Sequence, residues 1–563
     1  KRPLGLLGAT LGLLVFSIVL VGIVKPKVDF FPNAEPNFTY VYIKLPVGTD
    51  QRYTDSVTKI LEGKVYNVLG MQNGKKNPLV ESVISNVAVG ATDPQEGDRS
   101  TASNKSKISI AFVEFAHRDG KSTQEVLDKV REGMKGVVPG AEITVSKESN
   151  GPPTGKPVSI EIMGDDFNEL IATSKGLKRY LDSVGIKGVE ELKSDLQDKK
   201  PEIEIAINRE RANREGISTA QIGMELRNAI FGKEVSKFKD NNDEYPINLR
   251  YMKSQRENIN QLVNLKISYR DMNMGGMIRQ VPLSALADVQ YANAFGGIKR
   301  KAQKRIVTLS SNVLSDYNPN EVVAQVQAAV ENYKKPESVS ITMGGEQEQQ
   351  AETAGFLGNA MLISLGLILL ILVTQFNSIS KPILILSEIL FSLIGVLLGF
   401  SIFGMNISIV MTGIGIVALA GIVVRNGILL VEFTDLLMEQ GKPLKEAIIE
   451  AGKTRMTPVL LTATATMLGL VPLAIGFNID FLSLLETGNP HIFFGGDSVA
   501  FWGPLSWTMI FGLSFATFLT LILVPCMYYL NETGKERLYG WFGKKYVSKP
   551  EKKYLESLEV NHQ

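Results

Sequence analysis

A single arginine stands inside a long apolar stretch of the chain. Residues 405–433 read MNISIVMTGIGIVALAGIVVRNGILLVEF, with Arg425 as the one basic side chain. As a helix, the stretch exceeds the roughly 30 Å hydrocarbon layer of a membrane, and Arg425 lies about 12 Å before its end. A guanidinium keeps its charge, so at this depth it must be paired, hydrated or buried against other helices. The alternative is an arginine that reaches out to the lipid headgroups.

Small residues in the same stretch predict close packing around this arginine. Gly413, Gly415, Gly421 and Gly427 remove side-chain bulk at four positions. Glycine allows the backbones of neighbouring membrane helices to approach closely. The stretch is therefore expected to contact other helices as well as lipid.

Composition limits the classes of protein that the chain can form. Its 563 residues are 44% hydrophobic and 21% charged, enough for several membrane spans and more than one further domain. The net charge of +2 gives no indication of nucleic-acid binding. The lone Cys526 excludes an internal disulfide framework. His117, His491 and His562 lie too far apart for a helix-spaced zinc motif, although a scattered site stays open.

Hydropathy predicts six membrane spans. The first covers residues 4–24, and the other five follow after about 325 residues, at about 356–374, 382–403, 405–433, 457–477 and 501–530. Basic residues gather between the second and third spans, between the fourth and fifth spans, and in the tail. By the positive-inside rule both ends of the chain are cytoplasmic, and the long segment after the first span faces the other side. Because the sequence starts with lysine, it is expected to be a fragment, a processed product or a chain given without its start.

The long segment has the pattern of two α/β units. Strand-like and helical stretches alternate in the order β-α-β-β-α-β, the arrangement of ferredoxin-like domains. The second copy begins at residues 158–163, includes strands near Val189 and Ile203, and resumes at residues 305–311. An insertion from about 208 to 297 divides it, with a helix at 220–230 and a hairpin turned by Gly275 and Gly276. This pattern indicates a duplicated scaffold.

Several motifs resemble one family. They are KRPLGLLG at the start, FFPNAEPNFTYVYIKLPVGTD after the first span, GIVVRNGILLVEF around Arg425, and RMTPVLLTATATMLGLVPLAIG in the fifth span. With the arrangement of spans and α/β units, they resemble the C-terminal half of a resistance–nodulation–cell division efflux transporter. The resemblance implies an α+β membrane protein with six transmembrane helices, two ferredoxin-like porter units, and a docking-type insert in the second.

The resemblance also implies the domain boundaries. They are a first transmembrane helix at 1–27, a first porter subdomain at 28–155, a second porter subdomain at 156–207 and 298–350, a docking-type insert at 208–297, a five-helix transmembrane region at 351–530, and a cytoplasmic tail at 531–563.

In this family a basic residue on the fourth of these spans lies near two aspartates of the other half, and proton movement there drives transport. The resemblance places Arg425 at that position, where a lysine is usual, and matches Arg455 and Thr462 to the rest of the proton relay. Arginine stays charged and suits carboxylates, so Arg425 is expected to act as a fixed counter-charge. The alternatives are that Arg455 is a cytoplasmic flank and that Thr462 only bonds its own helix backbone. Glu388 is either a proton carrier or an interfacial or helix-packing acid.

The resemblance implies a proton-driven transporter without cofactors, in the inner membrane of a Gram-negative bacterium, with a large periplasmic domain. Its expected partners are an N-terminal half that carries the aspartate pair, further copies in a homotrimer, a periplasmic adaptor, an outer-membrane channel and membrane lipids. No nucleic-acid partner is expected. A membrane enzyme is disfavoured because no nucleophile, metal cluster or phosphate loop has convincing spacing. A membrane-anchored scaffold has no need of a buried arginine.

The substrate class rests on fewer residues. Metal-exporting relatives have an acidic residue where this chain has Arg425, which favours export of hydrophobic or amphiphilic molecules. Phe112 matches one position of a phenylalanine-rich drug pocket, although the loop NVAVGATD lacks the other aromatic residues and Phe112 alone is more typical of a core. The alternatives are envelope lipid transport, support of protein export and metal-cation export. Met272, Met274 and Met277 could bind a soft cation, but they lie in the hairpin expected to make docking contacts.

Overall fold

The computed structural model describes residues 3–32, 34–72, 74–94, 101–148, 155–196, 200–271, 275–294, 297–314, 317–541 and 547–561. The chain forms two compact units. One comprises residues 1–195 and 299–563, and the other, called here the insert unit, comprises residues 196–298.

Six helices are long and apolar enough to cross a membrane, which confirms the six predicted spans. They are α1 (Pro3–Val24), α11 (Glu346–Phe376), α12 (Ser380–Phe403), α13 (Ile409–Glu439), α14 (Leu444–Ile475) and α16 (Asp497–Trp541). Most begin before or end after the apolar runs, because polar turns continue the helix. The polar residues 346–355, for example, form the first turns of α11.

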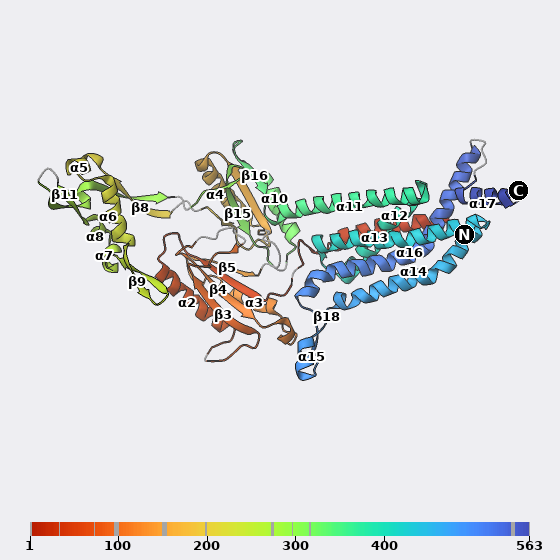
Figure 1. Cartoon of the computed structure of the whole chain (residues 1–563), viewed down its shortest axis with the longest axis horizontal. Helices are drawn as coiled ribbons and strands as arrows, with labels where there is room; N and C mark the ends of the chain where they lie inside the picture. The colour runs from red at the N-terminus through yellow and green to blue at the C-terminus, as the bar shows by residue number, and fades with distance from the viewer. Residues whose placement is uncertain are drawn as a thin grey trace. The chain divides into compact units, whose positions relative to one another are not determined.

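The centre of this bundle is formed by α12, α13 and α16, which lie side by side with α14 packed against α13 and α16 (Figure 1). Their most apolar windows are 61%, 50% and 50% buried, against 11% for α1, 6% for α11 and 17% for α14. The two groups therefore differ in how much apolar surface the chain itself covers. Surface left uncovered on α1, α11 and α14 is available to lipid or to other protein.

Neighbouring helices approach α13 closely at three of the four glycines where close packing was predicted. A Cβ at Gly415 would lie 3.0 Å from Thr508, and one at Gly413 would lie 2.8 Å from Leu357. At Gly427 the neighbour is the carboxyl group of Glu388, whose carbon would be 2.9 Å away. At Gly421 no atom of the described residues lies within 4 Å of such a Cβ, so a close approach at that position stays a prediction.

The first α/β unit contains a four-stranded antiparallel sheet in the order β3-β4-β2-β5. Its elements are β2 (Phe38–Lys44), α2 (Gln51–Val68), β3 (Val80–Val87), β4 (Lys105–Phe112), α3 (Thr123–Met134) and β5 (Glu142–Lys147). Asp50 caps α2 by accepting a hydrogen bond from the amide of Arg52. Alternate residues of β2, such as Val41 and Ile43, point into a core shared with the helices. The predicted order of strands and helices is present.

The second α/β unit repeats this order with one additional strand, β14. It consists of β6 (Val158–Gly164), α4 (Phe167–Val184), β7 (Lys193–Ser194), β14 (Lys299–Lys301), β15 (Lys304–Ser311), α10 (Pro319–Glu331) and β16 (Ser340–Met343). The sheet runs β14-β15-β6-β16, and β7 also pairs with β15. Asp166 caps α4, and Gly185 ends it in the left-handed conformation.

The insert unit begins earlier than predicted. The strand near Ile203, β8 (Lys200–Ile207), pairs along its full length with β13 (Ala287–Ala294) and not with the sheet of the second α/β unit. Assigning this strand to the second porter subdomain, with a boundary at 207, is therefore wrong. Alternating residues in β8 fit either sheet, and only the pairing with a strand about 80 residues later decides between them.

The rest of the insert unit is small. It contains α5 (Arg209–Arg214), α6 (Thr219–Phe231), β9 (Lys233–Asp240), β10 (Asp243–Leu249), α7 (Lys253–Arg256), α8 (Ile259–Val263), β11 (Lys266–Asp271), β12 (Met277–Pro282) and α9 (Leu283–Leu286). The predicted helix at 220–230 and the hairpin turned by Gly275 and Gly276 are confirmed.

Short elements complete the described chain. They are β1 (Val28–Asp29), η2 (Phe115–His117), β17 (Ile407–Ser408), β18 (Phe477–Ile479), α15 (Phe481–Thr487), β19 (Ile492–Phe494) and α17 (Lys549–Asn561). The parallel pairing of β1 with β17 joins the segment after α1 to the segment before α13.

Candidate functional site

Arg425 lies on an uncovered face of α13. The helix begins at the cap Ser408, whose hydroxyl accepts from the amide of Met411, and its other face is buried against α12 and α16. Asn426 and Gly427, next to the arginine, are buried, whereas Arg425 itself is exposed. Among the described residues no hydrogen bond or ion pair reaches its guanidinium. Within these residues it is neither paired nor buried.

Arg455 and Thr462 lie on the adjacent helix α14. The guanidinium of Arg455 lies 4.6 Å from the centre of the Phe433 ring on α13. Its buried Nε has no hydrogen-bond partner within the described parts of the chain. The Thr462 hydroxyl donates to the carbonyl of Val459 at 3.1 Å, a bond within its own helix. Arg455 lies in the first half of α14, whose 32 residues exceed the length needed to cross the hydrocarbon layer, so its place as a cytoplasmic flank or inside the span stays a prediction.

Thr462 on α14 lies at about the same level of the helix pair as Arg425 on α13. Phe433, which marks the level of Arg455, follows Arg425 by about 12 Å along α13. Because α14 runs antiparallel to α13, residues that follow Arg455 on α14 lie level with residues that precede Phe433 on α13. Thr462 follows Arg455 by about 10 Å along α14. Because α13 and α14 pack against each other, Arg425 and the Thr462 hydroxyl lie at one level, and Arg455 lies about two turns away from that level.

Phe112 has a packing role. Its side chain is 4% exposed and belongs to the core of the first α/β unit, together with Val80 and Ile110. A ring enclosed in this way presents no surface to a ligand, so the prediction of substrate contact by Phe112 lacks support and the core alternative describes its position.

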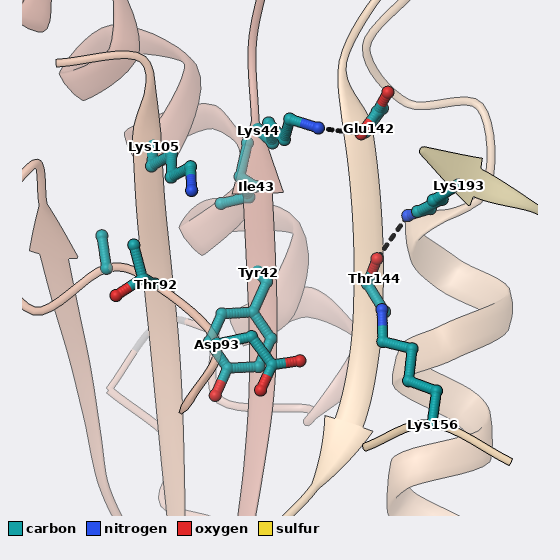
Figure 2. Close-up of a pocket in the computed structure, with 11 residues that line it drawn as sticks. Tyr42, Ile43, Lys44, Thr92, Asp93, Lys105, Glu142, Thr144, Lys156 and Lys193 are labelled. Atoms are coloured by element: carbon teal, nitrogen blue, oxygen red, sulfur yellow. Dashed lines mark hydrogen bonds and ion pairs between the residues drawn. The ribbon is translucent and has the colours of Figure 1, made fainter. Parts of the chain in front are cut away.

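The pocket beside that sheet is polar (Figure 2). Tyr42, Lys44, Lys105, Glu142 and Thr144 of the first α/β unit line it, together with residues such as Lys156 and Lys193. Lys44 forms an ion pair with Glu142 at 3.1 Å, and Lys193 donates to the Thr144 hydroxyl. Burial lowers the pKa of Lys193, and the nearby Glu191 opposes this effect. These side chains suit polar or charged groups.

The structure brings together two histidines that lie far apart in the sequence. The rings of His117 and His491 stack with their centres 5.7 Å apart. Among the described residues no group of three or more histidine, cysteine, aspartate or glutamate side chains is arranged to hold a metal ion. Of the three methionines in the insert hairpin, Met277 is exposed on β12, whereas Met272 and Met274 lie outside the described residues.

Sequence reasoning missed a buried ion pair among α12, α13 and α16. The Lys381 ammonium, 7% exposed, donates to Asp435 Oδ2 at 2.6 Å, and the Tyr528 hydroxyl donates to Asp435 Oδ1 at 2.5 Å. Lys381 is the basic residue between the second and third predicted spans, and Asp435 follows the apolar run 405–433 by two residues. Their spacing from the ends of the apolar runs gave no sign that they meet, because 54 residues separate them.

The six apolar helices, the duplicated α/β units and the basic side chains within the helices define a polytopic membrane protein of the transporter type. The chain belongs to the AcrB/AcrD/AcrF family, whose profile matches residues 2–532. This assignment confirms the resemblance to resistance–nodulation–cell division transporters.

The names of the relatives refer to different substrates or processes. The multidrug resistance protein MdtC of Erwinia tasmaniensis is 24% identical over 530 residues, which cover 92% of this chain and 46% of that protein. The cobalt-zinc-cadmium resistance protein CzcA of Cupriavidus metallidurans is 29% identical over 66% of this chain and 33% of that protein. The swarming motility protein SwrC of Bacillus subtilis is 29% identical over 65% of this chain and 32% of that protein.

A solved structure shares the fold. A heavy metal efflux pump superposes with a TM-score of 0.70 and 23% identity, over 94% of this chain and 51% of that chain. The chain therefore spans about half the length of this pump and of MdtC.

Proposed function

We propose that this chain supplies the C-terminal half of a proton-driven exporter, with Arg425 as the fixed counter-charge for carboxylates of the other half. The observation that carries the proposal is the exposed guanidinium of Arg425 on α13, at the level of Thr462 and in a membrane-length helix. An unpaired guanidinium in the hydrocarbon layer is costly, so an acidic partner at this depth stabilises the assembly. Arg455 and Thr462 complete the relay on α14.

The two α/β units form the porter part of this exporter. In support, the elements of the first follow one another in the β-α-β-β-α-β order of ferredoxin-like folds, and its sheet runs β3-β4-β2-β5. The sheet of the second runs β14-β15-β6-β16, with β7 also paired to β15. Substrate crosses between them, and rigid-body motion driven from the membrane helices changes the width of the passage.

The insert unit supports assembly with other chains. Its β9–β10 hairpin is exposed along its whole length and carries apolar side chains such as Val235, Phe238 and Ile247. Exposed apolar residues on a two-stranded arm are typical of a surface that packs on another protein. We therefore retain a homotrimer with a periplasmic adaptor and an outer-membrane channel, in the inner membrane of a Gram-negative bacterium.

For the substrate, Arg425 favours hydrophobic or amphiphilic molecules, because metal-exporting relatives have an acidic residue at this position. Metal-cation export is the second candidate, favoured by the similarity to CzcA and to a heavy metal efflux pump. Lipid transport or support of protein export remains the alternative that neither similarity favours.

A deletion strain tests the proposal. Loss of the gene is expected to raise sensitivity to, and accumulation of, amphiphilic dyes and detergents, with recovery by the wild-type gene. Sensitivity to Zn²⁺, Co²⁺ and Cd²⁺ is measured in parallel. Sensitivity confined to the metal ions contradicts the amphiphile assignment, and accumulation of an envelope lipid without either effect contradicts efflux altogether.

A further inference from the structure

Polar groups on α12, α13 and α16 form two levels inside the helix bundle. At the first level Lys381, Asp435 and Tyr528 bond to one another as described above. At the second level Glu388 on α12 lies against Gly427 on α13 and Thr520 on α16. On each helix the two levels are seven or eight residues apart, about 10 to 12 Å. The second level is the deeper one.

Glu388 has one satisfied and one unsatisfied carboxyl oxygen. Thr520, 1% exposed, donates its hydroxyl to Glu388 Oε2 at 2.8 Å. Glu388 is 4% exposed, and its Oε1 is fully buried with no hydrogen-bond partner in the described parts of the chain. Oε1 lies over the backbone of Gly427, where any side chain would collide with the carboxyl group. The glycine makes room for this carboxyl group.

Within the part of the chain that the structure describes, no cation bonds to the ionised form of Glu388. Among the described groups on the neighbouring helices, α1 has no titratable residue. At the first level Asp435 accepts from both Lys381 and the Tyr528 hydroxyl, so the Lys381 charge is paired there. Arg425 and Glu432 of α13 and Cys526 of α16 make no bond to Glu388. A buried carboxylate with an unpaired oxygen is costly, and adding a proton removes the charge.

We propose that Glu388 is a second proton-binding site of this transporter, separate from the relay at Arg425. On uptake an O–H bond forms at Oε1, and on release the proton returns to water, with no other bond changed. The level of Lys381, Asp435 and Tyr528 lies between Glu388 and the end of the bundle predicted to be cytoplasmic, so it is the polar route nearest to the site. The inference deepens the proposed function and rests on it for the link to transport.

A metal-ion occupant fits the site less well. Glu388 and Thr520 together supply three side-chain oxygens, whereas cations such as Ca²⁺ take six to eight oxygen ligands. The described residues contain no cluster of acidic or histidine side chains suited to a metal ion. A proton needs only one oxygen atom.

Infrared difference spectroscopy of the assembled protein in lipid tests proton binding without transport. A pH titration in H₂O and in D₂O is expected to show a protonated-carboxyl C=O band that persists at a pH where exposed carboxyl groups are ionised. This band should shift in D₂O and disappear in Glu388→Gln, which keeps the shape of the side chain. Thr520→Val should shift the frequency of this band, because it removes the hydrogen bond to Oε2. The matched control Glu432→Gln, an exposed acid on α13, should retain the band.

The result that overturns the inference is a wild-type spectrum without such a band at any pH, or a band unchanged in Glu388→Gln. Replacement of the proton by Na⁺, seen as a carboxylate signal that depends on Na⁺ concentration at fixed pH, also overturns it. Transport separates this failure from failure of the proposed function. If Arg425→Ala stops proton-driven export and the Glu388 band is absent, only the second site is lost.

Discussion

Close packing of α12 on α16 predicts a specific loss of stability in Gly395→Ala. A Cβ at Gly395 would lie 2.5 Å from the backbone oxygen of Phe511, whereas ordinary contacts start at 3.4 Å. The helices must separate locally by about 0.9 Å, because a backbone oxygen within a helix cannot rotate away. Overpacking of this kind costs about 1 to 3 kcal/mol. The higher helix propensity of alanine offsets up to about 1 kcal/mol of this.

The control for this substitution is Gly366→Ala on α11. Nothing lies within 4 Å of a Cβ at Gly366, so only the gain in helix propensity remains. Thermal unfolding of both variants, purified in lipid as the assembled protein, gives the comparison. The expected result is a lower Tm for Gly395→Ala and an unchanged or higher Tm for Gly366→Ala. Equal Tm values for Gly395→Ala and wild type would refute the packing argument.

Three further predictions use other contacts. Arg118→Ala should lower the stability of the first α/β unit by about 2 to 4 kcal/mol, because the guanidinium is 2% exposed and donates to Val113, Thr123 and Asn37. Thermal unfolding should show no change for Lys121→Ala, which replaces an exposed lysine. An equal effect of the two substitutions contradicts the prediction. Lys381→Met should lower the stability of the protein by about 3 to 5 kcal/mol, because it leaves the buried Asp435 carboxylate without its cation. Adding Asp435→Asn should recover part of the lost Tm. A double variant no more stable than Lys381→Met refutes the pairing of Lys381 with Asp435. Thr462→Val should reduce export in membrane vesicles, whereas Thr466→Val, which loses a similar hydrogen bond within its own helix, should not. Equal export by the two variants removes Thr462 from the proposed relay.

The elements of this chain were largely predictable because their signals are local. Membrane-length apolar runs predicted six helices, and alternating strand-like and helical stretches predicted the order of elements along the first α/β unit. The strand at Lys200–Ile207 was assigned to the wrong sheet, because its pattern does not encode its partner.

The contacts between distant segments were not predictable. Glu388 meets Thr520 across 132 residues, and Lys381 meets Asp435 across 54. Taken alone, each of these residues is typical of an interfacial charge or of a helix-packing group. Only the packing of α12 against α13 and α16 shows that each residue and its partner lie at the same level of the bundle. The role of Arg425 was inferred from depth and resemblance, and its exposure on α13 is what the structure adds.

Proton-driven export by Arg425→Ala in membrane vesicles, normalised to the amount of assembled protein, tests the role of this arginine most directly. The variant is expected to assemble and to lose export, because carboxylates of the other half then lack their fixed counter-charge. Arg425→Lys, which keeps the charge, should retain part of the export with an altered pH dependence. Normal export by Arg425→Ala would contradict the central role assigned to this arginine.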